Sequence, residues 1–429
     1  MHALIVSAVF PPEPVTSAIT SEDLAMGLVN AGHEVTVVTS SPNRPEGKLY
    51  PGYSRALRRV EVTKTGYRLI RTFSLLSPKP TVLGRFLENL SFGLTSMLNS
   101  LAVKPDVVYV NSWPIVAMGM ITFLFSIRNV PVVLNIQDIY PEAAIQLGKL
   151  PRHGPVPWIL KYIDGLIARH SAALITLSES FAEFYHTVRK VPRDRIHVVY
   201  NWMDDDEIKP GPRMGIFREA YGLSQDTFVL MYAGSVGSVA DLQTVIKAVA
   251  QLKEFDNILL MIVGDGSNRI ACESFAERLK VSNVRFLYPL RRDQVPQVHA
   301  AADLLVLPAH RSGALTSVPS KLIAYMLSGR PVLAAVDEAS DTAKIIRDAR
   351  CGVIVPPEDP QTMAMQIRNL LKMPAELAQM GVRARYYAQQ NFSRRVCVPK
   401  LIKILESVAN PHDNKAAHPG QRPPGHRFC

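Results

Sequence analysis

The sequence predicts two α/β domains, each built on a doubly wound parallel sheet. Three observations support this prediction. The chain has 429 residues, more than one hydrophobic core usually organises. Short apolar runs alternate with longer amphipathic segments throughout, which is the βαβ pattern of a parallel sheet. This rhythm is interrupted near residues 202–212 by three aspartates and a Pro-Gly-Pro sequence, a composition typical of an interdomain linker. We therefore predict domains at 1–203 and 204–385.

Each half contains six segments with the length and composition of buried strands. In the first half they are 2–9, 34–39, 107–110, 132–136, 173–177 and 197–200. In the second half they are 228–232, 259–263, 284–287, 304–307, 332–335 and 352–355. Helices are expected between them, for example at 21–30, where Gly32 can adopt the positive φ that ends a helix. One or two final helices are expected at 384–408. Residues 410–429 have almost nothing to bury and are predicted to form a disordered tail.

The net charge is +11 and most of it is local. Residues 48–85 contain nine lysines and arginines and one acid, Glu61, so this segment alone carries 9 − 1 = +8. A basic surface can contact an anionic membrane, a phosphorylated substrate or nucleic acid, or can simply be solvated. Nucleic acid is the least supported partner, because the chain lacks a recognition motif and aromatic residues interleaved with the basic ones.

Cysteine usage and the amino-terminal sequence favour a cytoplasmic protein. The four cysteines lie far apart and form no C-x-x-C pair, as expected for reduced residues. The amino terminus, MHALIVSAVFPP, has no basic region before its apolar run and is predicted to be a first strand rather than a signal peptide. The longest apolar stretch, 115–127, is shorter than the ~20 residues of a membrane-spanning helix.

Three loops of the second half follow predicted strands and carry residues suited to an anion. They contain AGSVGS after 228–232, GDGS after 259–263, and Pro319-Ser320-Lys321 at the start of a helix expected at 322–327. Ligands bind beyond the carboxyl ends of parallel strands, where glycines let backbone amides approach an anion and a helix N-terminus adds exposed N–H groups. Lys321 is unfavourable in a first helical turn by several tenths of a kcal/mol, so it favours an anionic partner such as a diphosphate. Tight turns are the alternative explanation for each glycine taken singly.

In the first half, the sequence Gln137-Asp138-Ile139-Tyr140-Pro141-Glu142 directly follows the strand at 132–136. Two carboxylates and a tyrosine at the carboxyl end of a strand form a candidate polar site. The alternative is structural: Asp138 begins a turn, and Glu142 lies in the first turn of a helix. Asn111 follows the strand at 107–110 in the same way.

The order of these motifs resembles that of the family 4, or group 1, retaining glycosyltransferases, and within them the L-fucosamine transferase-like branch of O-antigen and capsule biosynthesis. The motifs that carry the resemblance are AGHEVTVVTS, QDIYPEAAIQLG, ITLSESF, VVYNWMD, YAGSVGS, IVGDGSNR, AADLLVLP, SVPSKLIAYMLSGRPVLA and CGVIVPPEDP. They span nearly the whole chain in the order typical of the family.

The resemblance implies a GT-B fold, in which two Rossmann-like domains face each other across a cleft. It implies an acceptor-binding first domain, a second domain that binds a nucleotide sugar, and last helices, about 386–409, that pack back on the first domain. The donor would be a UDP-sugar, the sugar an N-acetylated deoxyhexosamine or hexosamine, and the acceptor a polyprenyl-diphosphate-linked saccharide. No cofactor and no metal are implied. The enzyme would act at the inner face of a membrane, where residues 48–85 would meet anionic headgroups and an apolar helix at 86–101 would lie in the interface. The alternative is that 86–101 is an ordinary core helix.

The resemblance also assigns site residues. The donor-binding positions are Gly234, Ser235, Gly237, Gly264, Asp265, Gly266, Leu290, Arg311, Ser317, Pro319, Ser320, Lys321 and Leu322. The acceptor-side positions are Thr16, Ser17, Asn111, Gln137 and Tyr140. Asp138 and Glu142 are the catalytic candidates. In a front-face retaining mechanism the leaving phosphate can take the acceptor's proton, so neither carboxylate need act as a base.

The sequence departs from the family pattern at several positions. The paired glutamates that flank the donor correspond to Thr316 and Ala324, and the loss of a ribose hydrogen bond would cost about 1–3 kcal/mol of donor affinity. The arginine and lysine usual near the first loop of the second domain are absent, and Ser235 and Ser238 stand there instead. Asn111 replaces a histidine. The alternatives to an active transferase are a catalytically impaired binding or assembly protein and a UDP-sugar 2-epimerase.

Overall fold

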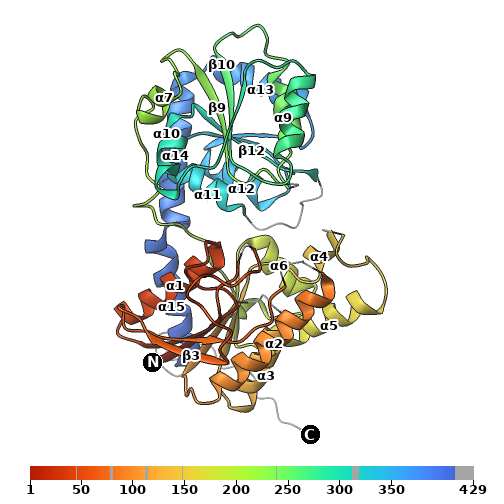
Figure 1. The fold of residues 1–429 in the computed structure, drawn as a ribbon, viewed down its shortest axis with the longest axis vertical. Helices are drawn as coiled ribbons and strands as arrows, with labels where there is room; N and C mark the ends of the chain where they lie inside the picture. Colours follow the sequence, from red (N-terminus) through yellow and green to blue (C-terminus); the bar gives the residue numbers. More distant parts are fainter. Residues whose placement is uncertain are drawn as a thin grey trace, which may run out of the picture. The chain divides into compact units, whose positions relative to one another are not determined.

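The computed structural model divides the chain into two compact units, which are described separately (Figure 1). The structure describes residues 1–44, 46–77, 81–111, 115–146, 148–237, 239–311 and 318–410. The first unit comprises Met1–Leu177, Phe181–Val199 and the chain from Val398 on, and the second comprises Ser178–Ser180 and Tyr200–Cys397. Of the tail predicted at 410–429, residues 411–429 lie outside the described residues.

The first unit is built on an eight-stranded sheet, with the strand order β3-β4-β2-β1-β5-β6-β7-β8. Its strands are β1 (His2–Ser7), β2 (Glu34–Ser40), β3 (Arg58–Val62), β4 (Arg68–Thr72), β5 (Val107–Asn111), β6 (Val132–Ile136), β7 (Ala173–Thr176) and β8 (Ile196–Val198). All six strands predicted for this half are present. Neighbouring strands are parallel except β3 and β4, which pair antiparallel at one edge.

Strands β3 and β4 correct the prediction of a six-stranded, wholly parallel sheet. They lie inside the basic segment 48–85, where arginines interrupt the apolar runs that mark the other strands. The Arg71 side chain is nevertheless buried, because its guanidinium donates to the carbonyls of Ser40 (3.3 Å) and Pro11 (2.6 Å). Part of the positive charge of this segment is therefore structural.

The helices of the first unit lie between its strands, as predicted. They are α1 (Thr16–Asn30), α2 (Val82–Ser100), α3 (Ile115–Ile127), α4 (Glu142–Gln146), α5 (Pro155–His170) and α6 (Glu179–Thr187). Helix α1 begins five residues before the predicted start at 21. It ends as predicted at Gly32, whose φ of 82° allows the amides of Gly32 and His33 to bond the carbonyls of Val29 and Leu28.

Helix α15 (Arg394–Ala409) contributes residues to both units. From Val398 on it packs against α1, where a Cβ on Gly27 would come within 2.5 Å of Val398 Cγ1. Further along, the Glu406 carboxylate lies 2.9 Å from His33 Nε2. These contacts place the second half of α15 on the first unit.

The second unit has a six-stranded parallel sheet with the order β11-β10-β9-β12-β13-β14, and all six predicted strands are present. They are β9 (Phe228–Ala233), β10 (Ile258–Val263), β11 (Val284–Leu287), β12 (Leu304–Pro308), β13 (Val332–Ala335) and β14 (Gly352–Val355). The helices are α7 (Ile216–Ala220), α8 (Leu242–Val249), α9 (Arg269–Arg278), α10 (Val295–Ala301), α11 (Ser320–Leu327), α12 (Asp341–Ala349), α13 (Pro360–Leu371) and α14 (Pro374–Asn391). Helices cover both faces, since alternate residues of β9 enter two separate cores. Both sheets therefore confirm the predicted α/β fold class.

The polar stretch predicted as a linker is bound to the second unit. Ser393 Oγ donates to the buried Asp205 carboxylate (2.5 Å), and the Arg385 guanidinium donates to the backbone carbonyl of Asp205 (2.9 Å). The aspartates at 204–206 thus fix this segment against the junction of α14 and α15.

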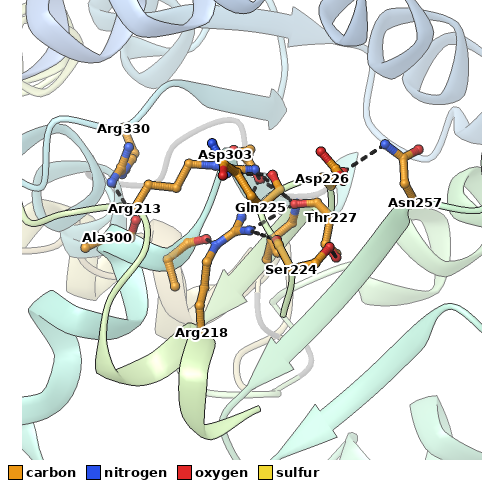
Figure 2. Close-up of polar contacts among 12 residues, drawn as sticks. Arg213, Arg218, Ser224, Gln225, Asp226, Thr227, Asn257, Ala300, Asp303 and Arg330 are labelled. Carbon is orange, nitrogen blue, oxygen red and sulfur yellow. Dashed lines mark hydrogen bonds and ion pairs between the residues drawn. The ribbon is translucent and has the colours of Figure 1, made fainter. Parts of the chain in front are cut away.

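A buried charged cluster fastens the segment after this stretch to the amino ends of β9 and β12 (Figure 2). The Asp303 carboxylate accepts from Arg218 Nη2 (2.6 Å), Arg213 Nε (2.5 Å) and the amide of Val229 (2.8 Å). Arg218 is fully buried, and burial lowers the pKa of its guanidinium. Arg330 lies in the same cluster and donates to the carbonyl of Ala300 (2.5 Å).

Candidate active site

A pocket of about 340 Å³ lies in the second unit, at the carboxyl ends of β9 and β10 and beside α10 and α11. Seven of the predicted donor-binding residues line it: Gly234, Ser235, Gly264, Asp265, Leu290, Ser320 and Lys321. Nine further residues complete the lining: Met203, Ala233, Val263, Pro289, Val295, Val298, His299, Ala324 and Tyr325. The predicted residues Gly237, Gly266, Arg311, Pro319 and Leu322 are not among the lining residues. Ser317 and Thr316 lie outside the described residues.

Gly234 and Gly264 are closely packed, and their own amides are bonded to backbone carbonyls. The Gly234 amide donates to the carbonyl of Val263 (2.9 Å), and the Gly264 amide donates to that of Leu287 (3.0 Å). A Cβ on Gly264 would overlap the Gly234 carbonyl oxygen. Among the described residues, the amides of Ser235 and Gly237 have no backbone acceptor. These two amides, rather than those of Gly234 and Gly264, are therefore available to a ligand.

Lys321 is held in the pocket by neutral oxygen atoms. Its Nζ donates to the hydroxyl of Tyr232 (2.6 Å) and lies 3.4 Å from the carbonyl oxygen of Ser235. The ammonium also lies 4.7 Å from the centre of the Tyr232 ring. Its alkyl stem crosses Gly234, where any Cβ would overlap Lys321 Cε. Burial lowers the pKa of the Lys321 ammonium, since no carboxylate compensates its charge there.

The wall of the pocket is tied to the end of β9 by two aromatic residues. The Tyr325 hydroxyl accepts from the amide of Ala233 (3.0 Å) and donates to its carbonyl (3.2 Å). His299 packs edge-on against Tyr325, and burial lowers its pKa to about 4, so the imidazole is neutral. Ser328 Oγ donates to the Ala324 carbonyl, so His299 Nδ1 donates to Ser328 Oγ (2.8 Å) and Nε2 is the acceptor nitrogen.

An arginine that the sequence analysis did not single out joins two loops of the pocket. Arg269 donates to the carbonyls of Gly264 (2.5 Å) and Leu287 (2.7 Å). Its guanidinium lies 4.0 Å from the ring centre of the exposed Tyr288. By contrast, the predicted Arg311 lies next to Glu358, whose carboxylate accepts from the Arg311 amide (3.3 Å).

In the first unit, Asn111 is the centre of a buried polar network. Its amide nitrogen donates to the hydroxyls of Ser7 (2.9 Å) and Ser21 (2.7 Å), and its carbonyl oxygen accepts from Asn135 (2.7 Å). Ser21 in turn donates to the carbonyl of Ser17 (2.7 Å). Thr16 and Ser17 are the first two residues of α1 and are half-buried. The predicted acceptor-side residues Ser17 and Asn111 are therefore connected, and the Asn111 amide is occupied by structural hydrogen bonds.

Glu142 lies in the first turn of α4, as the alternative interpretation expected, and it forms an ion pair. Its carboxylate accepts from Arg189 Nη2 (2.7 Å), and Arg189 Nε also bonds the buried Asp164 (2.7 Å). Asp138 is exposed after β6, although partial desolvation raises the pKa of its carboxyl. Gln137 and Tyr140 flank it and are half-buried. Of the two catalytic candidates, Asp138 is the more accessible.

A buried carboxylate that the sequence analysis missed lies in the proline-rich turn after β1. Glu13 accepts from the amides of Phe10 (3.0 Å), Asn43 (2.9 Å) and Arg44 (2.8 Å), so it joins the loops after β1 and β2. Burial is the largest influence on this group and raises its pKa to about 7. The only sequence signal was a glutamate among prolines.

The described residues hold neither a metal-binding cluster nor a membrane-spanning helix. Within the described ranges, no three His, Cys, Asp or Glu side chains are grouped so as to hold a metal ion. No helix in the part of the chain that the structure describes is both long and apolar enough to cross a bilayer.

Comparison with known proteins identifies the class. Residues 17–202 match the glycosyl transferase 4-like domain, and residues 215–387 match the domain of glycosyl transferases group 1. The chain is therefore a glycosyltransferase. Its two halves are the two domains of the group 1 enzymes of the GT-B type.

Individual relatives are similar over most of the chain. An uncharacterised glycosyltransferase of Methanocaldococcus jannaschii is 24% identical over 383 residues, covering 86% of this chain and 89% of the relative. The putative colanic acid biosynthesis glycosyl transferase WcaI of Escherichia coli is 24% identical over 418 residues, covering 94% and 100%. Among solved structures, HepE of Anabaena in complex with UDP has a TM-score of 0.68 and 16% identity, covering 95% of this chain and 100% of HepE. That likeness confirms the fold.

Proposed function

We propose that this glycosyltransferase moves a sugar from a UDP-sugar, with retention of the anomeric configuration, to a polyprenyl-diphosphate-linked saccharide during cell-surface polysaccharide synthesis. The pocket of the second unit is the donor site in this proposal. The observation that carries it is the position of Lys321, a half-buried cation at the start of α11 whose partners among the described residues are neutral oxygen atoms.

The pocket supplies what a departing diphosphate needs. Lys321 gives a positive charge, and the N-terminus of α11 adds exposed amides and the positive end of the helix dipole. The free amides of Ser235 and Gly237 lie on the loop that Lys321 already contacts. Preorganised donors of this kind stabilise the charge that develops on a leaving group. A bound anion would also stabilise the charged form of Lys321 and so offset the effect of burial on its pKa.

The remaining lining suits a nucleoside. Pro289, Leu290, Val295 and Val298 give the pocket an apolar side, and His299 adds one acceptor nitrogen. Ligand pockets commonly combine apolar walls with a few polar groups that orient the ligand. HepE, whose fold is similar to that of this chain, was solved in complex with UDP, and this supports UDP as the nucleotide.

The first unit is proposed to hold the acceptor. Asp138 is the accessible polar group at the end of β6, whereas Glu142 is engaged by Arg189. We therefore assign no base to the protein: the leaving phosphate takes the acceptor's proton, and Asp138 orients the acceptor. The name of WcaI supports polysaccharide synthesis as the setting. The proposed sugar, an N-acetylated deoxyhexosamine or hexosamine, rests on the resemblance to the L-fucosamine transferase-like branch.

The ribose is the weakest-held part of the donor in this proposal. Ala324 lines the pocket where the family pattern has a glutamate, so this position provides no carboxylate for the ribose hydroxyls. Restoring the carboxylate with Ala324→Glu should therefore raise UDP affinity. A hydrogen bond to a charged group is worth about 1.5–3 kcal/mol, or roughly tenfold to a hundredfold.

Calorimetric titration with UDP tests the proposal. The wild type should bind, and Lys321→Met should bind at least about tenfold more weakly, because a charge-assisted hydrogen bond is lost. Lys344→Met removes an exposed lysine of α12 outside the pocket and is the matched control. If UDP binds equally to Lys321→Met and the wild type, the donor site has been misplaced.

The alternatives give different results with UDP-sugars. An impaired binding protein, which the missing carboxylate at Ala324 would favour, binds UDP but never transfers a sugar. A 2-epimerase isomerises a UDP-sugar without any acceptor. Release of UDP that requires a lipid-linked acceptor supports the transferase.

A further inference from the structure

The first unit exposes large apolar side chains on the outer faces of α2, α3 and α5, where a water-soluble helix normally carries charge. On α5 every exposed residue from Val156 to Leu166 has a large apolar or aromatic side chain. They are Val156, Trp158, Ile159, Tyr162, Ile163 and Leu166, each between 38% and 67% exposed. The opposite face of α5, which includes Ala168, is buried.

Helix α2 has the same inverted pattern. Its exposed residues are Leu83, Phe86, Leu87, Leu94 and Leu98, spaced three, four and seven apart, so they share one face. Its charged residues do not reach that face: Glu88 is buried, and Arg85 pairs with it (2.8 Å).

The three helices are neighbours, so their exposed residues form one surface (Figure 1). Helix α2 packs on α3 at Gly93, where a Cβ would lie 2.9 Å from Met120 Sδ. Helix α3 packs on α5 at Gly119, where a Cβ would lie 3.0 Å from Ile167 Cδ1. Between them α3 exposes Phe123 and Ile127, 67% and 66% accessible. We call the exposed apolar side chains of these helices the apolar helix surface.

Basic residues border this surface. Lys149, Arg152 and His153 are exposed in the loop that leads into α5. At the end of α2, Asn99 donates to the carbonyl of Leu57 (3.2 Å), which brings the exposed arginines at the start of β3 next to the helix. The acid within α5, Asp164, is buried and paired with an arginine.

We propose that the apolar helix surface docks on an anionic phospholipid bilayer. Helices that lie in a membrane interface bury leucine, phenylalanine and tryptophan while nearby lysines and arginines meet anionic headgroups. Trp158 and Tyr162 stack at 6.0 Å, and this pair belongs to the residue types enriched at the interface. The inference rests on the proposed function for its biological sense, because a polyprenyl-linked acceptor lies in such a bilayer.

Co-sedimentation of the full chain with vesicles tests this inference. The wild type should bind vesicles of phosphatidylglycerol mixed with phosphatidylcholine and bind phosphatidylcholine alone more weakly. A double variant, Ile159→Asp with Ile163→Asp, should lose at least about tenfold in binding, because two apolar side chains that would enter the bilayer are replaced by anions. Ile270→Asp, at a residue 78% exposed on α9 in the second unit, is the matched control and should bind as the wild type does.

The basic border gives a second arm. Lys149→Gln and Arg152→Gln should each weaken binding to the phosphatidylglycerol vesicles by about fivefold and leave binding to phosphatidylcholine unchanged. All the substituted residues are accessible, so thermal unfolding should confirm that the variants are folded.

Three results would overturn the inference. The wild type fails to bind phosphatidylglycerol vesicles, or the double variant binds them as well as the wild type does. Alternatively, sedimentation velocity shows a dimer that the double variant abolishes without any vesicle binding, which would make the surface an interface between copies. UDP titration of the same proteins separates the two proposals, because vesicle binding without UDP binding defeats only the donor site.

Discussion

Asp303 is the shared anion of the charged cluster in Figure 2, and Asp303→Asn should destabilise the second unit without affecting its pocket. The carboxylate neutralises Arg218, which is fully buried, and Arg213, which is partly exposed. Breaking a buried ion pair costs about 3–5 kcal/mol because an uncompensated charge is left behind. Arg218 retains the carbonyl of Ala301 as an acceptor, and the asparagine keeps one oxygen for the amide of Val229. We therefore expect the lower end of that range, about 3 kcal/mol.

Urea unfolding followed by the emission of Trp202 measures this loss, because Trp202 is buried in the second unit. Glu207→Gln is the control: it removes an exposed pair with Arg292 (2.8 Å) and should cost less than about 1 kcal/mol. The cluster lies at the amino ends of β9 and β12, so the UDP affinity of Asp303→Asn should equal that of the wild type. A loss below about 1 kcal/mol for Asp303→Asn would refute the account of a buried, uncompensated arginine.

Three further substitutions test individual sites. Gly234→Ala should weaken UDP binding in calorimetry by about tenfold or more, because residue 234 has a φ of 142° and its new Cβ would displace Lys321. Gly237→Ala is the control and should bind UDP as the wild type does, since its Cβ meets nothing closer than 3.7 Å. Burial raises the pKa of Glu13 to about 7, so the folded protein binds the proton more tightly than the unfolded chain does. The free energy of unfolding should therefore fall by up to about 3 kcal/mol as the pH rises from about 4.5 to about 7. Urea titrations of Glu13→Gln should show no such pH dependence. Glu142→Gln should lower the free energy of unfolding of the first unit by about 1–3 kcal/mol, because its ion pair with Arg189 is lost, and should change the transfer rate less than about threefold. A roughly hundredfold loss of rate at unchanged stability would instead make Glu142 catalytic.

The strands were predictable from the sequence where buried apolar runs alternate with helical segments. All twelve predicted strands are present, because the strands inside a parallel sheet are near-continuous apolar runs and the edge strands β8, β11 and β14 still fit the alternation with helices. The strands β3 and β4 were not predicted, since arginines whose charges are met by distant carbonyls, as in Arg71, hide that signal.

The candidate site was predictable only in part. The loops after β9 and β10 and the start of α11 were found from strand ends and glycines, and they line one pocket. The partner of Lys321 could not be found this way, because Tyr232 lies 89 residues away and belongs to a strand whose other residues are core. Glu13 was missed for a similar reason: the amides of residues 43 and 44 that hold it lie 30 and 31 residues further along the chain.

Hydrogen exchange of the backbone amides with and without UDP tests the central claim most directly, namely that UDP binds in the pocket of the second unit. The account predicts that UDP slows exchange at Ser235, Gly237 and Lys321, whose amides lie on the loop after β9 and at the start of α11. The amides of Gly234 and Gly264, already bonded to neighbouring strands, should exchange slowly in both states. Protection elsewhere in the chain, with no change on these two segments, would contradict the assignment of the donor site.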